Sequence, residues 1–93
     1  MTVYVDDMRM QATVGKLSSR WSHLTADTPD ELLDFALKLG LRRSWIQHPG
    51  TYKEHFDLTE GMRQRALRNG AVAITISEAG ALLKAKREKL RGQ

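Results

Sequence analysis

Residues 28–40 read TPDELLDFALKLG, and this stretch predicts the best-defined element of the fold, an amphipathic helix over residues 29–39. Thr28 and Glu31 form a capping box, in which each side chain accepts a hydrogen bond from the backbone N–H of the other residue. Gly40 stands where helices commonly end in a left-handed turn. Leucines and alanines at helical spacing between these signals predict one buried face, and charged residues lie on the opposite face.

Four short segments around this helix are rich in β-branched and aromatic residues and end abruptly in polar ones, so they are predicted as strands. They cover residues 2–6, 21–24, 44–47 and 71–76. Two further helices are predicted. One begins near Thr59 and ends before Asn69-Gly70, and the other spans residues 78–90 with Ser77 as its cap.

The predicted order of elements is β-β-α-β-α-β-α. Strands that alternate with helices of about ten residues indicate right-handed crossovers between parallel strands. The sequence therefore predicts a single small layered α/β domain with a largely parallel sheet, in which the direction of the first strand is open. Residues 8–20 show no helical period, and Gly15-Lys16 could turn a loose hairpin within them.

The length of 93 residues predicts one domain over residues 1–93, with residues 76–93 as a basic C-terminal helix that could be peripheral. The chain has no cysteine, which excludes disulfides and thiolate metal sites. The N-terminus lacks the basic and apolar regions of a signal peptide, and no apolar run approaches the roughly 20 residues of a membrane span. A cytoplasmic protein without a membrane partner is expected.

The net charge of +4 is concentrated at the C-terminal end. Residues 84–93 carry five Lys or Arg and one Glu, whereas residues 1–83 carry ten basic and ten acidic side chains. Such a tail could make weak contacts with nucleic-acid phosphates. The side chains in question are Lys84, Lys86, Arg87 and Lys89. The alternative is a solvated helix end whose cations complement the helix dipole.

Four segments of the chain carry a resemblance to known proteins. They read MTVYVDDMRM (1–10), RWSHLTAD (20–27), ELLDFALKLGLRRSWIQH (31–48) and EHFDLTEGMRQRALRNGAV (54–72). In these segments the chain resembles a family of small bacterial and bacteriophage proteins described only as a domain of unknown function. The resemblance implies a compact single domain, often phage-encoded and then located in the host cytoplasm. It implies no activity and no catalytic residues.

No glycine-rich phosphate loop, HExxH, GxSxG or zinc-ligand quartet is present. The remaining signal is one of position, because acids and histidines fall near the ends of different predicted strands and ligands bind at such ends in parallel sheets. Asp6, Asp7, His23 and His55 are the candidate catalytic residues. Asp6 and Asp7 are also the candidate metal ligands, for Mg²⁺ or Mn²⁺.

Further residues are candidates for binding at the same edge of the sheet: Trp21, Arg42, Gln47, His48, Tyr52 and Asp57. Simpler interpretations exist for all of these residues. Two acids after a strand are common in turns and caps, a histidine beside a tryptophan is often bonded to backbone, and arginines among acids often form a solvated face. The spacing of His55 and Asp57 suits a shared ligand only if the chain is extended there.

Three functions stay open at this point. The first is a small hydrolase or nuclease-like enzyme with the acid and histidine cluster as its site. The second is a protein-interaction module that acts on a host or phage partner, which predicts an exposed apolar patch. The third is a nucleic-acid-binding module, which predicts steep salt dependence. The hydrolase is the hypothesis that names residues, and it requires the acids and histidines to converge.

Overall fold

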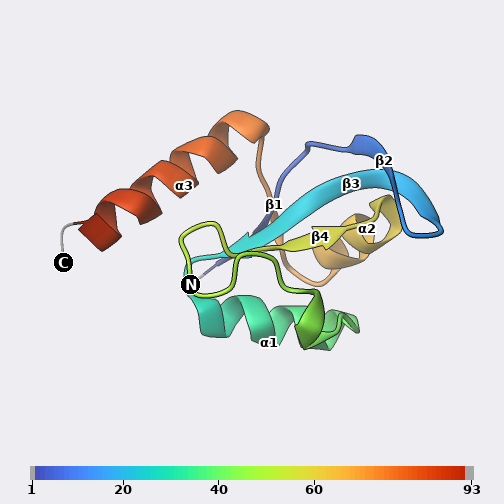
Figure 1. Ribbon diagram of the computed structural model, residues 1–93, viewed down its shortest axis with the longest axis horizontal. Coiled ribbons are helices and arrows are strands. Elements are labelled where there is room, and N and C mark those ends of the chain that lie inside the picture. Colours follow the sequence, from blue (N-terminus) through green and yellow to red (C-terminus); the bar gives the residue numbers. More distant parts are fainter. Residues whose placement is uncertain (1, 92–93) are drawn as a thin grey trace.

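The computed structural model describes residues 2–91 (Figure 1). Its strands are β1 (Val3–Val5), β2 (Met10–Val14), β3 (Leu17–Ala26), β4 (Phe56–Leu58) and β5 (Val72–Ala73). Its helices are α1 (Pro29–Leu39), α2 (Glu60–Arg68), α3 (Ile76–Arg91) and the short 3-10 helix η1 (Arg43–Trp45). No helix among these residues is long and apolar enough to cross a membrane.

The sheet is mixed and mostly antiparallel. The long strand β3 pairs antiparallel with β1, β2 and β4, and only β1 and β5 run parallel. Leu24 of β3 is opposite both Val5 and Phe56, so β1 and β4 flank β3 on its two edges. β2 and β3 form a hairpin that turns at Gly15-Lys16, where Gly15 has a φ of 62°. A positive φ at the first turn residue is what such two-residue turns require.

The core lies between one face of this sheet and the helices α1 and α2. Strand residues on this face are buried, and they pack against the apolar faces of the two helices. The buried apolar side chains are Val5, Leu24, Ala26, Leu32, Ala36, Leu39, Leu41, Phe56, Leu58, Ala66 and Ala71. The alternation along β3 places Ser22, Leu24 and Ala26 in this core, and it turns His23 and Thr25 to the other face.

The predicted helix over residues 29–39 is confirmed as α1. Thr28 accepts a hydrogen bond from the backbone N–H of Glu31 at 3.3 Å, and its hydroxyl donates to the Glu31 carboxylate at 2.8 Å. Gly40 has a φ of 95° and ends the helix in the left-handed region, as expected. α2 begins after Thr59, as predicted. α3 begins two residues earlier than predicted, and Thr75 rather than Ser77 caps it.

The prediction of a largely parallel sheet with the order β-β-α-β-α-β-α is wrong, since the order is β-β-β-α-β-α-β-α. The interpretation assumed that a helix between two strands makes a parallel crossover. Here α1 is followed by a long connection, residues 40–55, which returns the chain so that β4 runs antiparallel to β3. The hairpin expected at Gly15-Lys16 is present, and its two arms, β2 and the first part of β3, add a strand that the predicted order lacked.

The predicted strand over residues 44–47 is also wrong. Arg43–Trp45 form η1, and Gln47 makes one antiparallel bridge with His55, through hydrogen bonds of 2.8 and 3.1 Å. The edge of β3 that a further strand could join is occupied by β4. A short apolar run without a free sheet edge cannot satisfy its backbone groups as a strand, and it forms a local turn instead.

A bulge separates β1 from β2 along the edge of β3. Val5 is opposite Leu24 and Met10 is opposite Trp21, so residues 6–9 stand opposite only Ser22 and His23. The extra residues bend the chain, and Arg9 within them has a φ of 46°. Bulges of this kind often redirect side chains near functional sites. In this protein the bulge begins at Asp6.

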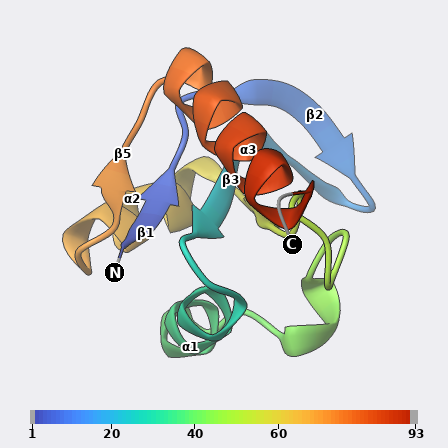
Figure 2. The ribbon, with the colours of Figure 1, turned by 90° about the vertical axis from the view of Figure 1, so that its left-hand side faces the viewer.

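α3 lies over the second face of the sheet (Figure 2). No residue of this helix is buried, in contrast to α1 and α2. The Lys86 ammonium group donates hydrogen bonds to the Thr25 hydroxyl, at 3.0 Å, and to the Ala26 carbonyl. The sheet therefore has one packed face and one face that α3 covers loosely. Residues 92–93 of the predicted C-terminal helix lie outside the described residues.

Candidate functional site

Four polar side chains meet on the sheet face under α3. His23 projects from β3, and Asp57 of β4 is directly opposite it in the sheet register. His55 precedes β4, two positions before Asp57, and an extended chain presents such residues on the same face. Asp6 ends the β1 segment at the start of the bulge. The convergence thus depends on pairing between β1, β3 and β4, which are distant in sequence.

The Asp6 carboxylate holds His23 in place. Its Oδ2 atom lies 2.7 Å from Nδ1 of the His23 ring, and its Oδ1 atom accepts hydrogen bonds from the backbone N–H groups of His23, at 3.0 Å, and Met8, at 3.2 Å. Asp6 is only 4% exposed. Arg63, also buried, donates from Nε to the Asp6 carbonyl at 3.1 Å. The carboxylate is therefore a fixed acceptor, which takes one donor from the bulge, at Met8, and two from His23.

His55 is oriented by a different acceptor. Its Nδ1 atom lies 2.7 Å from the carbonyl oxygen of Lys53, which accepts a hydrogen bond and so places the ring proton on Nδ1. In the neutral ring the Nε2 atom of His55 then carries a lone pair, and this atom lies 3.2 Å from Oδ1 of Asp57. The rings of His55 and His23 meet edge to face with centroids 4.9 Å apart.

The two histidines present the same nitrogen to the same space. Nε2 of His23 lies 3.9 Å from Oδ1 of Asp57, and one ligand atom each from His23, His55 and Asp57 lie within 4.8 Å of one another. Two imidazoles and one carboxylate are a donor set that binds divalent transition metal ions. Side-chain exposures of 36% for His23 and 43% for Asp57 leave this point open to solvent.

The charges of Asp6 and His23 stabilise each other. Burial alone raises the pKa of Asp6, but the hydrogen bonds from the His23 ring and from backbone N–H groups outweigh burial, so the pKa lies below its ordinary value. The hydrogen bond to Asp6 raises the pKa of His23, against burial, which lowers it, and the charges of Asp6 and Asp57 add to the rise. In the metal-free protein this pair is therefore ionised over a widened pH range.

A cavity of about 170 Å³ opens over the cluster. Its sheet side carries Asp6, His23, Thr25 and His55. The side formed by α3 and the segment before it is apolar and consists of Ile74, Ala79 and Leu83. His48, Lys53 and Glu54 complete the lining. His48 has a φ of 51°, and its ring centroid lies 5.9 Å from that of His55. All three histidines of the chain therefore border one cavity.

The structure separates several other candidate residues from this cluster. The Asp7 carboxylate accepts a hydrogen bond from the backbone N–H of Ile76, at 3.0 Å, at the start of α3. Asp6 therefore accepts hydrogen bonds from His23 of β3, whereas Asp7 accepts one from α3. Trp21 donates from its ring to the Ala12 carbonyl at 3.0 Å, within the β2–β3 hairpin.

The other expected binding residues have varied positions. The guanidinium of Arg42 lies 5.6 Å from the centroid of the Trp45 ring, and Gln47 bridges to His55 through backbone. Tyr52 lines a second cavity. In the basic C-terminal segment, the Lys86 ammonium group donates hydrogen bonds to Thr25 and Ala26 of β3.

Sequence reasoning missed the carbonyl of Lys53, the side chains of Thr25 and Glu54 and the apolar wall of α3. A usable signal existed for one part of the site. Residues 22–26 alternate small or apolar groups with His23 and Thr25, which indicates a strand with a polar second face. A backbone carbonyl that orients a ring carries no sequence signal.

A family model described as "Protein of unknown function (DUF4031)" matches residues 3–86, which include every residue of the cluster. The match confirms the resemblance seen in the sequence. A search of curated proteins and a search of solved structures found no match. The family description names no activity, so the chemistry has to follow from the geometry of the site.

Proposed function

The chain belongs to the DUF4031 family of proteins of unknown function, and we propose that it is a metal-dependent hydrolase. The metal ligands in this proposal are Nε2 of His23, Nε2 of His55 and the carboxylate of Asp57. One observation carries the proposal: both histidines have their Nδ1 atoms bonded to acceptors and both turn Nε2 toward Asp57, and in the neutral ring this nitrogen carries the lone pair that binds a metal.

The arrangement around the ligands is typical of metal sites. Histidines that bind metals donate their second ring N–H to a carboxylate or a backbone carbonyl, which fixes the tautomer and the ring orientation. Asp6 provides the carboxylate for His23, and Lys53 provides the carbonyl for His55.

The donor set also favours particular ions. Imidazole nitrogens favour Zn²⁺ or Fe²⁺, the Asp57 carboxylate also suits Mn²⁺, and Mg²⁺ prefers ligand sets made of oxygen alone. The proposal therefore keeps Mn²⁺ from the sequence-based expectation, adds Zn²⁺, and moves the ion from Asp6 and Asp7 to the histidines. Asp6 and Asp7 bond different elements of the fold, and Asp6 already accepts three hydrogen bonds.

Three protein ligands leave coordination positions for water and substrate. A divalent ion in such a site can lower the pKa of a water molecule to about 7 and polarise a carbonyl or phosphoryl oxygen. The residues of the chain hold the site: Asp6 maintains His23, and the wall of Ile74, Ala79 and Leu83 excludes bulk water from one side. Lys53 lines the cavity and can contact an anionic group of a substrate.

Metal binding by the folded protein tests the proposal. Isothermal titration with Zn²⁺ and Mn²⁺, and the absorption spectrum of the Co²⁺ form, should show one site in the wild type. Asp57→Asn and His55→Ala should each weaken binding by about tenfold or more, since each removes a ligand. Asp34→Asn is the matched control, because Asp34 is exposed on α1 and pairs with Lys38 of the same helix.

Hydrolysis completes the test. The metal-loaded wild type should cleave chromogenic carboxylate and phosphate esters faster than the metal-free protein, and Asp57→Asn should not. Equal metal affinity in the wild type and Asp57→Asn would overturn the proposal, as would the absence of binding of Zn²⁺, Mn²⁺ and Co²⁺ to a protein shown to be folded by circular dichroism.

A second candidate, a protein-interaction module, is favoured by a different observation. The β2–β3 hairpin projects at one end of the molecule (Figure 1) and exposes Met10 by 57%, Val14 by 59% and Leu17 by 52%. Exposed apolar groups that gather on one element are typical of binding surfaces. Replacing Val14 and Leu17 by serine should then abolish self-association or partner binding in sedimentation experiments without lowering stability. Unchanged sedimentation would remove this candidate.

A further inference from the structure

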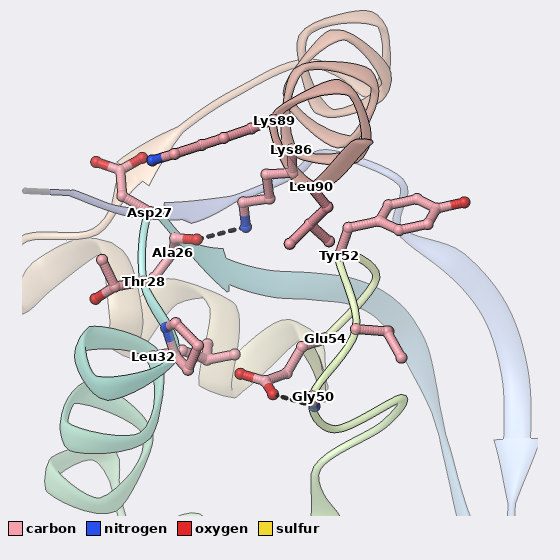
Figure 3. A pocket seen from close by; sticks show the side chains of 12 residues that line it. Ala26, Asp27, Thr28, Leu32, Gly50, Tyr52, Glu54, Lys86, Lys89 and Leu90 are labelled. Carbon is pink, nitrogen blue, oxygen red and sulfur yellow. Dashed lines mark hydrogen bonds between the residues drawn. The ribbon is translucent and has the colours of Figure 1, made fainter. Parts of the chain in front are cut away.

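A second and larger cavity adjoins the histidine cavity. Its volume is about 310 Å³, against about 170 Å³ for the cavity over the histidines. It lies between the second half of α3, the start of α1 and the loop over residues 50–54 (Figure 3). A volume of this size is at the lower end of the range of small-molecule binding sites.

The two cavities lie side by side beneath α3 and together form a crevice, which the Lys86 side chain crosses to reach Thr25 and Ala26. Glu54 lines both cavities. On β3, Thr25 lines the histidine cavity and the next residue, Ala26, lines the larger one. On α3, Leu83 borders the first cavity and Lys86, about one turn later, borders the second. A molecule in the larger cavity therefore lies next to the histidine cavity.

The larger cavity combines an apolar floor with charged groups at its mouth. Leu32 and Ala26 form part of the floor, and Leu90 covers it from α3 (Figure 3). Lys86 and Lys89 extend from α3 on the same side. The crevice therefore offers apolar contact and two ammonium groups to the same ligand.

Two acids, Asp27 and Glu54, line the same cavity and their charges act on Lys86, but hydrogen bonds already hold their carboxylates in place. Both oxygens of Asp27 accept hydrogen bonds, from the Thr2 N–H at 3.0 Å and from the Tyr4 hydroxyl at 2.8 Å. Glu54 accepts from the Gly50 N–H at 2.7 Å.

The ammonium groups of Lys86 and Lys89 still have N–H groups that can donate hydrogen bonds to a ligand. Lys86 uses two of its three N–H groups on β3, and Lys89 extends toward Asp27 (Figure 3) but lies beyond ion-pair distance of every acidic side chain in residues 2–91. The unused hydrogen-bonding capacity therefore favours an anionic ligand.

We propose that this cavity binds the body of the substrate, and that the substrate is a small organic anion with an apolar part the size of an aromatic ring. The apolar part contacts Ala26, Leu32 and Leu90, and the anionic group contacts Lys86 and Lys89. The inference deepens the proposed hydrolase function, because it names the class of molecule that reaches the histidines. Binding in this cavity itself requires no metal.

Nuclear magnetic resonance titration of the metal-free protein tests the inference with four probes. 1-Naphthyl phosphate and 1-naphthoate each combine a ring with an anion, 1-naphthol is a ring without the anion, and inorganic phosphate is an anion without the ring. The first two should shift the amide signals of Ala26, Gly50 and Leu90. 1-Naphthol and phosphate should bind at least tenfold more weakly. A preference between the first two identifies phosphate or carboxylate as the anionic group.

Two variants of α3 separate specific contact from general attraction by the basic helix. Lys89→Glu should weaken binding of the preferred probe at least fivefold, whereas Lys84→Glu, with the same charge change at an exposed position outside the cavity, should have little effect. Equal losses in both variants, shifts confined to the C-terminal tail, or equal affinity for inorganic phosphate would overturn the inference.

Failure of this inference is distinguishable from failure of the hydrolase proposal. Asp57→Asn should bind the probes as the wild type does, because Asp57 does not line the larger cavity. Loss of probe binding in Asp57→Asn would contradict a separate cavity. Metal binding without probe binding would overturn only the inference, and probe binding without metal binding would overturn only the proposed metal centre.

Discussion

Replacing Asp6 by asparagine should disable the candidate metal centre while leaving the fold in place. The asparagine Oδ1 atom can still accept from the backbone N–H groups of Met8 and His23, and this requirement fixes the amide orientation. Its NH₂ group then faces Nδ1 of His23, which has to act as acceptor. The ring proton moves to Nε2, and the lone pair that the proposal assigns to the metal is lost.

The expected magnitudes follow from the three hydrogen bonds to the Asp6 carboxylate. Asp6→Asn keeps two of them without the charge, which should cost about 1–2 kcal/mol. Asp6→Ala leaves two N–H groups beside a buried space, at about 1–3 kcal/mol each, and should cost about 2–6 kcal/mol. Metal affinity should fall by about 10–100-fold in Asp6→Asn, the usual effect of losing a partner of a metal-binding histidine.

Three measurements check this prediction. Urea unfolding gives the free energy of unfolding of both variants, long-range ¹H–¹⁵N spectra give the tautomer of His23, and titration with Zn²⁺ gives the affinity. Asp34→Asn, an exposed change of the same kind, should leave all three unchanged. An Asp6→Asn protein that keeps the Nδ1–H tautomer and wild-type affinity would refute the reasoning, as would a fully stable Asp6→Ala.

Three further predictions concern stability. In the metal-free protein, the raised pKa of His23 contributes stability that is present below about pH 6.5 and is lost as pH rises through the pKa of His23 in the folded state. The lowered pKa of Asp6 contributes stability that is present above about pH 4 and is lost as pH falls through the pKa of Asp6 in the folded state. The difference in unfolding free energy between wild type and Asp6→Asn should therefore peak between these pH values, and a flat difference would contradict the ion pair. Thr28→Ala should lower the unfolding free energy by about 1 kcal/mol in urea melts, because it removes the cap of α1, and no change would show that the capping box is not needed. Deleting residues 84–93 should preserve a cooperative thermal melt, because no residue of α3 is buried, and a non-cooperative melt would show that the helix stabilises the core.

Several features of the candidate site could be predicted from the sequence because their causes are local. His55 and Asp57 are two residues apart, so an extended chain alone presents them on the same face. Asp6 follows a short β-branched strand, which indicates a polar group at a strand end. The grouping of these residues with His23 rested on an expected parallel sheet, whereas the structure brings them together through antiparallel pairing of β3 with β1 and β4.

The roles within that set were decided by tertiary structure. Asp6 and Asp7 are neighbours in sequence, but the bulge turns one toward His23 and the other toward the N-terminus of α3. A bulge depends on the register of the partner strand, and register has no signature in a single strand. The sequence therefore could not distinguish the carboxylate that orients a histidine from the one that caps a helix.

The sequence by itself determined the elements whose stabilising groups are close together in the chain. α1 is the clearest case, since the capping box of Thr28 and Glu31 and the glycine at position 40 act within one helix. The direction of the strands, the conversion of residues 44–47 into a turn and the position of α3 over the polar face were decided only by the tertiary structure. Each of them depends on which sheet edge or face is still free once the rest of the chain has packed, and that competition between distant segments leaves no local trace in the sequence.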